Sequence, residues 1–203
     1  MKTGNVMWLR ISGVCGVLTP VVAVICISLA INSAPEFSWV ESALSDLGLV
    51  LGATSAFFNY GLIISGILGF VFATGVFGFL GESVVSRTGA FILVVAMVAF
   101  TAIGVFPENV RPTHFLVSVA FFVLLPISML IITAAFWLKR QVRMAVFTLV
   151  MAVSAAAPWV LLFTVRYVSG VAVPEAASGL VASVWTLVLS CKMLKQVSRV
   201  KAP

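Results

Sequence analysis

Six long apolar runs dominate this chain, and the short gaps between them hold almost every charged residue. Each run has about 20 residues or more, the length that an α-helix needs to cross a hydrocarbon layer of about 30 Å. A soluble domain does not combine 62% hydrophobic with only 9% charged residues. The sequence therefore predicts an all-α, polytopic membrane protein with six transmembrane helices.

We expect one six-helix transmembrane domain over residues 1–203, with helices at about 11–31, 55–80, 88–106, 113–138, 144–167 and 174–194. Pro20, Pro126 and Pro158 fall near the middle of three of these helices and are expected to bend them. Trp159 and Trp185 lie deeper than an interfacial aromatic belt would place them. We expect both to line an internal cavity that the bends open.

The charges are segregated by sign when successive gaps are assigned to alternate sides of a membrane. One side collects Glu82 and ten basic residues, Lys2, Arg10, Arg87, Lys139, Arg140, Arg143, Lys192, Lys195, Arg199 and Lys201. The other side collects Glu36, Glu41, Asp46, Glu108, Glu175, Arg111 and Arg166. Because basic residues accumulate in cytoplasmic loops, we expect both termini inside the cell and a multi-pass protein of the cell membrane. The net charge of +6 then reflects contact with anionic lipids and not with nucleic acid.

The longest outer gap, residues 32–54, is expected to contain a short interfacial helix. Ser38 and Glu41 have the spacing of a capping box, in which the two side chains satisfy the first free amides of a helix. Phe37 and Trp39 would anchor that helix at the membrane surface. The following Ser45-Asp46-Leu47-Gly48 segment marks its end and the start of another turn.

Small residues recur every four positions in the second expected helix, at Gly61, Ser65, Gly69 and Ala73. Such a stripe allows another helix backbone to approach closely. We expect either a neighbouring helix of the same chain or a second copy to pack there, so a homo-oligomer through this face is one expectation.

Three short segments resemble a family of archaeal and bacterial six-helix membrane proteins catalogued as a domain of unknown function. They are Ser45-Asp46-Leu47-Gly48, Phe57-Phe58-Asn59-Tyr60-Gly61, and Gly104-Val105-Phe106-Pro107-Glu108 leading to His114. The resemblance covers essentially the whole chain in length and hydropathy. It implies a six-helix fold in a prokaryotic cell membrane and no particular activity.

Polar groups gather at the outer ends of the helices and form the expected ligand-binding set, Glu41, Ser45, Asp46, Asn59, Glu108, Arg111, His114 and Arg166. Polar groups at membrane depth normally face the interior of a bundle. Ser118 lies one helical turn from His114 on the same face. Asp46 has no basic residue in its own loop, so we expect Arg111 or Arg166 to pair with it.

Three interpretations of this cluster stay open. The first is a clasp of ion pairs that ties the outer loops together, with His114 capping a helical hairpin. The second is an outward-facing pocket that binds a lipid headgroup or small amphiphile, or that belongs to a small proton- or ion-linked transporter. The third is a lipid-active hydrolase with His114 as general base and Ser118, Ser45 or Ser42 as nucleophile, or with Glu108 or Asp46 activating water. We favour the lipid- or amphiphile-binding pocket.

The sequence gives no reason to expect a metal ion or a cofactor. A single histidine cannot supply a three-histidine zinc site or a bis-histidine haem site. Cys15, Cys26 and Cys191 all lie in apolar runs and do not have metal-ligand spacing. The expected partners are therefore membrane lipids.

Overall fold

A computed structural model of the chain describes residues 3–201, and within them every regular element is helical. The elements are α1 (Thr3–Asn32), the 3-10 helix η1 (Leu44–Gly48), α2 (Ala53–Leu80), α3 (Val84–Val105), α4 (Thr113–Leu138), α5 (Val142–Val165) and α6 (Ala172–Lys201). Each of the α-helices in this range is long and apolar enough to cross a membrane. The predicted all-α fold with six membrane-spanning helices is confirmed.

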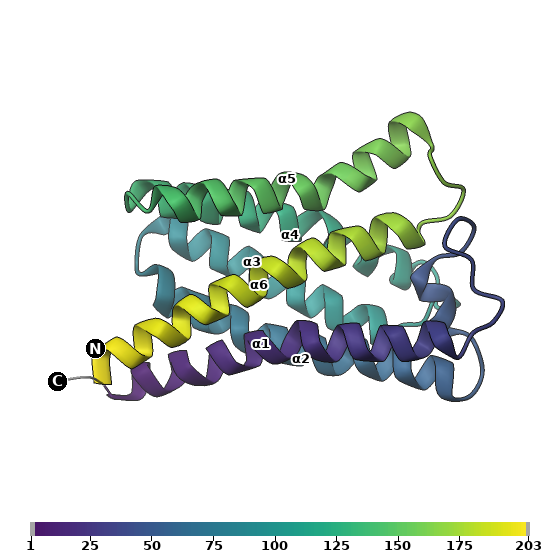
Figure 1. Cartoon of the computed structure of the whole chain (residues 1–203), viewed down its shortest axis with the longest axis horizontal. Helices are drawn as coiled ribbons and strands as arrows, with labels where there is room; N and C mark the ends of the chain where they lie inside the picture. Colours follow the sequence, from purple (N-terminus) through teal and green to yellow (C-terminus); the bar gives the residue numbers. More distant parts are fainter. Residues whose placement is uncertain (1–2, 202–203) are drawn as a thin grey trace.

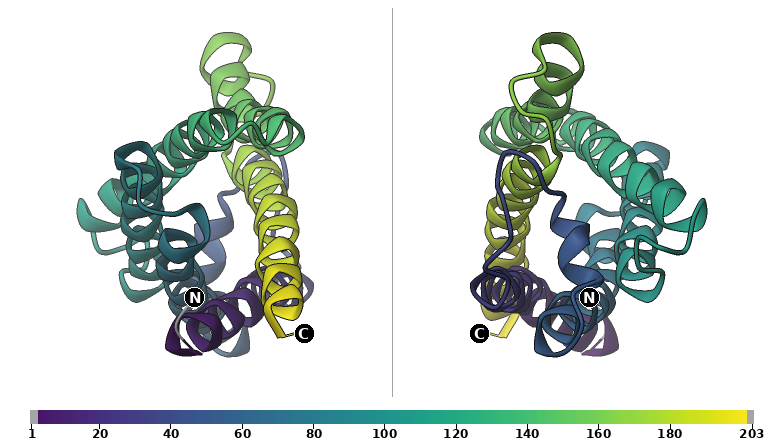
Figure 2. Two further views of the ribbon diagram at one scale, coloured as in Figure 1. Left: turned by 90° about the vertical axis from the view of Figure 1, so that its left-hand side faces the viewer. Right: turned by 90° about the vertical axis from the view of Figure 1, so that its right-hand side faces the viewer.

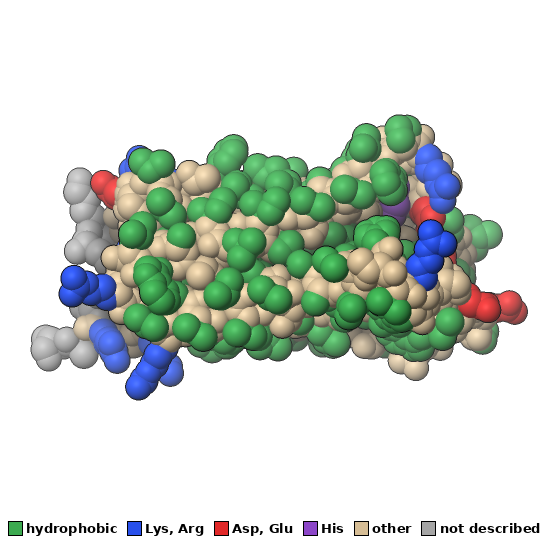
Figure 3. Space-filling model, turned by 90° about the horizontal axis from the view of Figure 1, so that it is seen from above, with side chains coloured by type: hydrophobic (Ala, Val, Ile, Leu, Met, Phe, Trp, Pro, Cys, Tyr) green, Lys and Arg blue, Asp and Glu red, His purple; other side chains and the backbone are tan. Residues whose placement is uncertain are grey.

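The α-helices follow one another around a ring (Figures 1 and 2). Each packs mainly on its neighbours in sequence, and α6 returns to contact α1 and close the ring. Both termini lie at one end of the bundle, which we call the inner end, and η1 lies within the ring at the opposite, outer end (Figure 2). Figure 3 shows basic side chains at both ends, with more of them at the inner end, and acidic ones mainly at the outer end. That the inner end faces the cytoplasm stays a prediction from these charges.

Several helices are longer than the apolar runs that mark them. α1 begins before Arg10, and α6 continues through Lys192 and Lys195 to Lys201. We expect the basic ends of these helices to extend past the hydrocarbon layer, because a helix can continue into the headgroup region where Lys and Arg side chains meet water and phosphate. α3 begins earlier than expected because the Ser83 side chain accepts a hydrogen bond from the Ser86 amide, at 3.1 Å, and caps the helix.

The short helix of the first outer loop differs from the prediction in place and in burial. The Ser38 hydroxyl does accept a hydrogen bond from the Glu41 amide, at 3.3 Å, but this segment forms a single turn. The helix is η1, and Leu44 and Leu47 are both buried. These leucines draw η1 into the mouth of the ring and away from the membrane surface, since burying them removes apolar area from water.

The small-residue stripe of α2 is occupied within the chain. A Cβ at Gly61 would lie 2.4 Å from Cys26 of α1, and one at Gly69 would lie 2.6 Å from the Met97 sulfur of α3. Ser65 and Ala73 are fully buried. The stripe thus brings α1 and α3 against α2, so its four residues are not open to a second copy. A homo-oligomer stays a prediction without an assigned surface.

The inner half of the ring is packed with large apolar side chains. Phe72, Val76, Trp185 and Met193 are all fully or almost fully buried. The Trp185 indole N–H donates to the Thr148 hydroxyl at 3.3 Å, which satisfies the buried donor. The expectation that Trp185 lines a cavity is therefore wrong, because its ring fills the space between α2, α5 and α6.

Candidate functional site: a capped cavity at the outer end

A cavity of about 330 Å³ occupies the outer half of the ring. Its described lining comes from α1, α2, α3, α4, α6 and the first outer loop, and α5 supplies none of it. Pro20 lines it, whereas Pro126, Pro158 and Trp159 do not. Trp159 packs on Phe122 instead, with ring centroids 4.7 Å apart. The sequence predicted an internal cavity, but most of the residues that line it were not predicted.

The separation of α1 and α6 creates this cavity. The two helices are in tightest contact near Gly16, where a Cβ would lie 2.1 Å from the Ser190 hydroxyl. The cavity wall begins one turn further out, at Thr19 on α1 and Thr186 on α6. The outer ends of the two helices lie apart, with the first outer loop between them (Figures 1 and 2). The close contact near Gly16 and the loop between the outer ends together hold α1 and α6 in a V shape.

The cavity opens sideways between these two helices. Several lining residues are also exposed on the outside of the bundle: Val24 of α1 is 44% exposed, Leu180 of α6 is 59% exposed, and Trp39 is 46% exposed. All three are apolar or amphipathic. The rim of the opening is therefore apolar, with Trp39 at its outer end.

η1 covers the outer end of the cavity and is hydrogen-bonded to two separate walls. The Leu44 amide donates to a side-chain carboxyl oxygen of Glu175 in α6 at 2.7 Å. The Ser45 hydroxyl donates to the Glu108 carboxylate of the α3–α4 turn at 3.2 Å. Because both bonds are part-buried, each is worth about 1–3 kcal/mol to the position of η1.

The segments that carry the family resemblance meet in one joint beside η1. The Asn59 amide group donates to the Gly48 carbonyl at 3.0 Å, and a Cβ at Gly48 would lie 2.6 Å from the Asn59 side-chain oxygen. A Cβ at Gly104 would lie 2.5 Å from the Asn59 backbone oxygen. Glycine is required at Gly104, because the backbone of α2 approaches too closely for a side chain, whereas a side chain at Gly48 would displace the Asn59 amide group from its hydrogen bond.

The outer loops are clasped together by their backbones. In the loop before α6, the Gly170 amide donates to the Val40 carbonyl at 2.7 Å, and the Ala172 amide donates to the Ser42 carbonyl at 2.9 Å. A Cβ at Gly170 would collide with the backbone of Glu41. One predicted interpretation was a clasp of ion pairs between the outer loops. The structure joins these loops through backbone hydrogen bonds instead.

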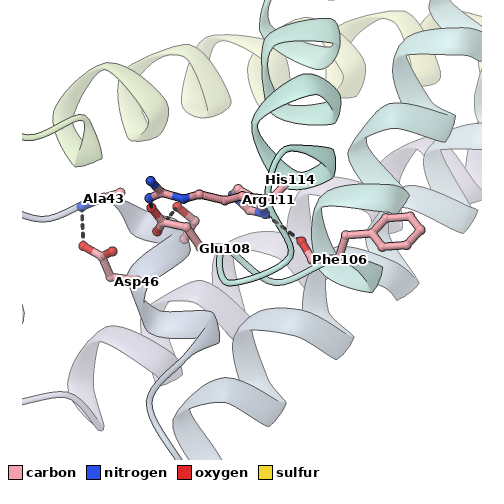
Figure 4. A network of polar contacts seen from close by, with 7 residues as sticks. Ala43, Asp46, Phe106, Glu108, Arg111 and His114 are labelled. Atoms are coloured by element: carbon pink, nitrogen blue, oxygen red, sulfur yellow. Dashed lines mark hydrogen bonds and ion pairs between the residues drawn. The ribbon is translucent and has the colours of Figure 1, made fainter.

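The expected ion pair of Asp46 with an arginine is wrong. Among the described residues, the ion pair at the outer end joins Arg111 to Glu108, at 2.8 Å. Arg166 ends α5 in a left-handed conformation with φ 52° and is exposed. Asp46 accepts a hydrogen bond from the Ala43 amide at 2.7 Å, which caps η1. Figure 4 shows Asp46, Glu108 and Arg111 in place.

Asp46 and Glu108 form a pair of neighbouring carboxyl groups with opposite pKa shifts. Burial raises the pKa of Asp46, the Ala43 N–H lowers it, and Glu108 raises it further. Burial alone would also raise the pKa of Glu108, but the neighbouring Asp46 and hydrogen bonds from Arg111 and Ser45 lower it below its ordinary value. Asp46 is thus the member of the pair that holds a proton more readily, and Glu108 carries the charge that Arg111 balances.

His114 is buried at the start of α4 and caps the end of α3 (Figure 4). Its Nδ1 lies 2.7 Å from the Phe106 carbonyl oxygen. Because a carbonyl oxygen only accepts, Nδ1 must carry the proton and donate. Ser118, one turn further along α4, lines the cavity, and His114 does not. The arrangement fits the capping interpretation of His114 and gives Ser118 a place in the wall.

Of the predicted ligand-binding residues, Ser45 alone lines the cavity, and Asp46, Glu108 and Arg111 lie behind it in the cap. Glu41 is exposed in its turn, apart from this group. Sequence reasoning missed Glu175, which was counted only as a loop charge. It lies in the first turn of α6 and in the cavity wall. An acidic residue within an expected membrane span is itself a signal of function.

These features define a class: a multi-pass membrane protein whose described residues form a ring of helices around an outer cavity, capped by the first loop. The chain belongs to the family described as Protein of unknown function (DUF998), whose profile matches residues 17–192. The family resemblance drawn from the short segments is thereby confirmed. No curated protein and no solved structure matches the chain.

Proposed function

We propose that this protein binds an amphiphile of the outer leaflet, with its apolar part in the cavity and its polar head at η1. The observation that carries the proposal is the sideways opening between α1 and α6, because a ligand reaches it directly from lipid. The composition of the walls supports it: most of the lining is apolar, as at Ile27 and Leu62, with hydroxyl groups at the inner end and the carboxyl group of Glu175 beside Ser45 at the top.

The polar head sets the selectivity of such a site. An acyl chain that moves from bilayer hydrocarbon into an apolar cavity gains little, since both surroundings are equally apolar. The free energy of selection must then come from contacts at the top of the cavity. Glu175 and Ser45 line that region, and Asp46 and Glu108 lie behind it. A head that donates hydrogen bonds, an amine or a polyol, fits these acceptors better than a phosphate monoester.

The packed inner half argues for binding in preference to transport. Trp185 and Phe72 meet edge to face, 6.4 Å between ring centroids, directly inward of the cavity. The described lining of the cavity does not reach the inner basic loops. Hydrolysis is less favoured, because the Nδ1 of His114 is held by Phe106 and His114 lies outside the lining.

A pair of glycine substitutions tests the proposal. A Cβ at Gly179 meets nothing within 4 Å although Gly179 lines the cavity, so Gly179→Leu fills the cavity without a clash at Cβ. Gly78 of α2 also has nothing within 4 Å of an added Cβ, is exposed and does not line the cavity, so Gly78→Leu is the matched control. Both changes gain about 1 kcal/mol of helix propensity.

The assay uses the full-length protein in phosphatidylcholine nanodiscs that contain phosphatidylethanolamine with a photoactivatable group in the acyl chain. Crosslinks are read at the buried lining residues Leu62 and Phe121, which bulk lipid outside the bundle does not contact. We expect both to be crosslinked in the wild type and in Gly78→Leu, and to lose most of the label in Gly179→Leu. Equal labelling of these residues in all three proteins would show that their label does not depend on space in the cavity, and the proposal would be rejected.

A further inference from the structure

A second concave site lies at the inner end, remote from the cavity. It is a groove of about 620 Å³ between the end of α4, the first turn of α5 and the last turns of α6. Its described lining contains five cationic side chains and no acidic one; the cations are Arg140, Arg143, Lys192, Lys195 and Arg199. We call this site the basic groove.

The basic side chains that α6 contributes to the groove repel one another. Lys192, Lys195 and Arg199 are spaced three and four positions apart, so they share one face of the helix. Like charges at these spacings destabilise a helix by a few tenths of a kcal/mol per pair. Among the described residues, none of the three lies in an ion pair. Their side chains converge on the groove without a protein counter-charge.

Arg140 holds an unfavourable backbone conformation at the opposite wall. The Arg140 amide donates to the Trp137 carbonyl and the Gln141 amide to the Phe136 carbonyl, both at 2.9 Å, which is the pattern of a Schellman motif. The left-handed residue of this motif is usually glycine, and here it is Arg140 with φ 58°. An arginine in this conformation costs about 1–2 kcal/mol. A glycine would avoid this cost but would not supply the cationic side chain that lines the groove.

The first turn of α5 adds partial positive charge. Gln141, Val142, Arg143 and Met144 all line the groove, so the end of α5 with free backbone amides faces it. Lys139, next to this turn, is engaged elsewhere, because its ammonium group donates to the Leu80 carbonyl at the end of α2. The groove thus combines a helix N-terminus with side chains that are free to bind an anion.

We propose that the basic groove binds the phosphate of an anionic phospholipid from the leaflet at the inner end. The groove lies at the inner ends of the apolar spans, where we expect lipid headgroups. Its lining includes Phe79, Val142 and Met144, and Val146 continues an exposed apolar surface along α5 for an acyl chain to follow. Basic pockets between helices at this depth recognise anionic headgroups. This site is independent of the outer cavity.

Two arginine-to-glycine substitutions form the matched test. Arg140→Gly and Arg166→Gly each remove one positive charge and each relieve a left-handed residue at a helix end, because φ is 58° at Arg140 and 52° at Arg166. Only Arg140 lines the groove. Both variants should melt a few degrees higher than the wild type, so neither is expected to fail through misfolding.

Lipid binding is measured on the full-length protein in detergent by native mass spectrometry, with dioleoyl phosphatidylglycerol and dioleoyl phosphatidylcholine titrated separately. We expect phosphatidylglycerol to bind at least tenfold tighter than phosphatidylcholine. Arg140→Gly should weaken phosphatidylglycerol roughly fivefold, and Arg166→Gly should leave it unchanged. The double variant R143Q/K195Q should weaken it roughly 30-fold, against no comparable loss in R10Q/R87Q.

Three results would overturn the proposal. Equal binding of the two lipids would show that the groove does not read the headgroup charge. Equal losses in the groove variants and their controls would reduce the effect to general surface electrostatics. Inorganic pyrophosphate that binds the detergent-solubilised protein more tightly than phosphatidylglycerol would assign the groove to a soluble phosphate compound and not to lipid.

Discussion

The hydrogen bond between Glu175 and the first outer loop gives the sharpest test of the capped cavity. Glu175→Ala removes the acceptor of the Leu44 amide, now 2.7 Å away and part-buried. The orphaned N–H loses its partner at a cost of about 1–3 kcal/mol. Glu175→Gln keeps a side-chain carbonyl in the same place, so the cost should fall below about 1 kcal/mol.

The loss should be local, because the other contacts of the loop stay in place. Ser45 remains bonded to Glu108, and the Gly170 amide remains bonded to Val40. We therefore expect the cap to open more often without global unfolding. An opening free energy lowered by 1–3 kcal/mol corresponds to amide exchange roughly 5–150 times faster at Leu44 and its neighbours.

Hydrogen exchange with residue resolution, on the full-length protein in detergent micelles, measures this directly. The thermal midpoint should fall by about 2–4 °C for each kcal/mol of the loss in Glu175→Ala. Unchanged exchange at Leu44 in Glu175→Ala would refute the role of the Glu175 carboxyl group in holding η1. A loss in Glu175→Gln as large as in Glu175→Ala would show that an acceptor oxygen at this position does not by itself hold the Leu44 amide.

The other predictions concern the cap, the α3–α4 hairpin, the inner core and the topology. Asp46→Asn keeps an acceptor for the Ala43 amide and removes a carboxylate beside Glu108. The raised pKa of Asp46 means that its contribution to stability is complete below about pH 4 and is lost as the pH rises through the folded-state pKa. The melting temperature of Asp46→Asn relative to wild type should thus increase from pH 4 to pH 7; a relative decrease would contradict the assignment. His114→Gln keeps a donor for Phe106 and should unfold near the wild-type temperature, whereas His114→Ala should lose about 1–3 kcal/mol; equal effects would remove the capping role. Trp185→Ala should cost about 3–5 kcal/mol in chemical unfolding, because the indole is fully buried, and a loss under 1 kcal/mol would contradict the packed inner half. Cysteines introduced at Asn109 and Ser169 should react with an impermeant reagent outside intact cells and one at Val142 should not; outside labelling at Val142 would invert the topology.

The sequence by itself determined the helices and their approximate ends. Apolar runs long enough to cross a bilayer form helices, because lipid cannot hydrogen-bond to free backbone amides and a helix pairs them within the segment. Local capping was also readable, as with Ser38 and the Glu41 amide. The start of α1 before residue 11 and the continuation of α6 beyond residue 194 were not predicted, because basic side chains such as Arg10 and Lys195 end an apolar run without ending the helix.

Only the tertiary structure decided what lies inside the ring. Pairing between distant residues depends on how the helices are rotated and crossed, and an apolar helix that is hydrophobic all round has no face that encodes its rotation. Hence the sequence predicted an ion pair between Asp46 and an arginine, whereas the packing of the outer loops places Asp46 beside Glu108. The sequence predicted only a loop charge at Glu175. In the structure, the V shape of α1 and α6 places its side chain in the cavity wall, 2.7 Å from the Leu44 amide.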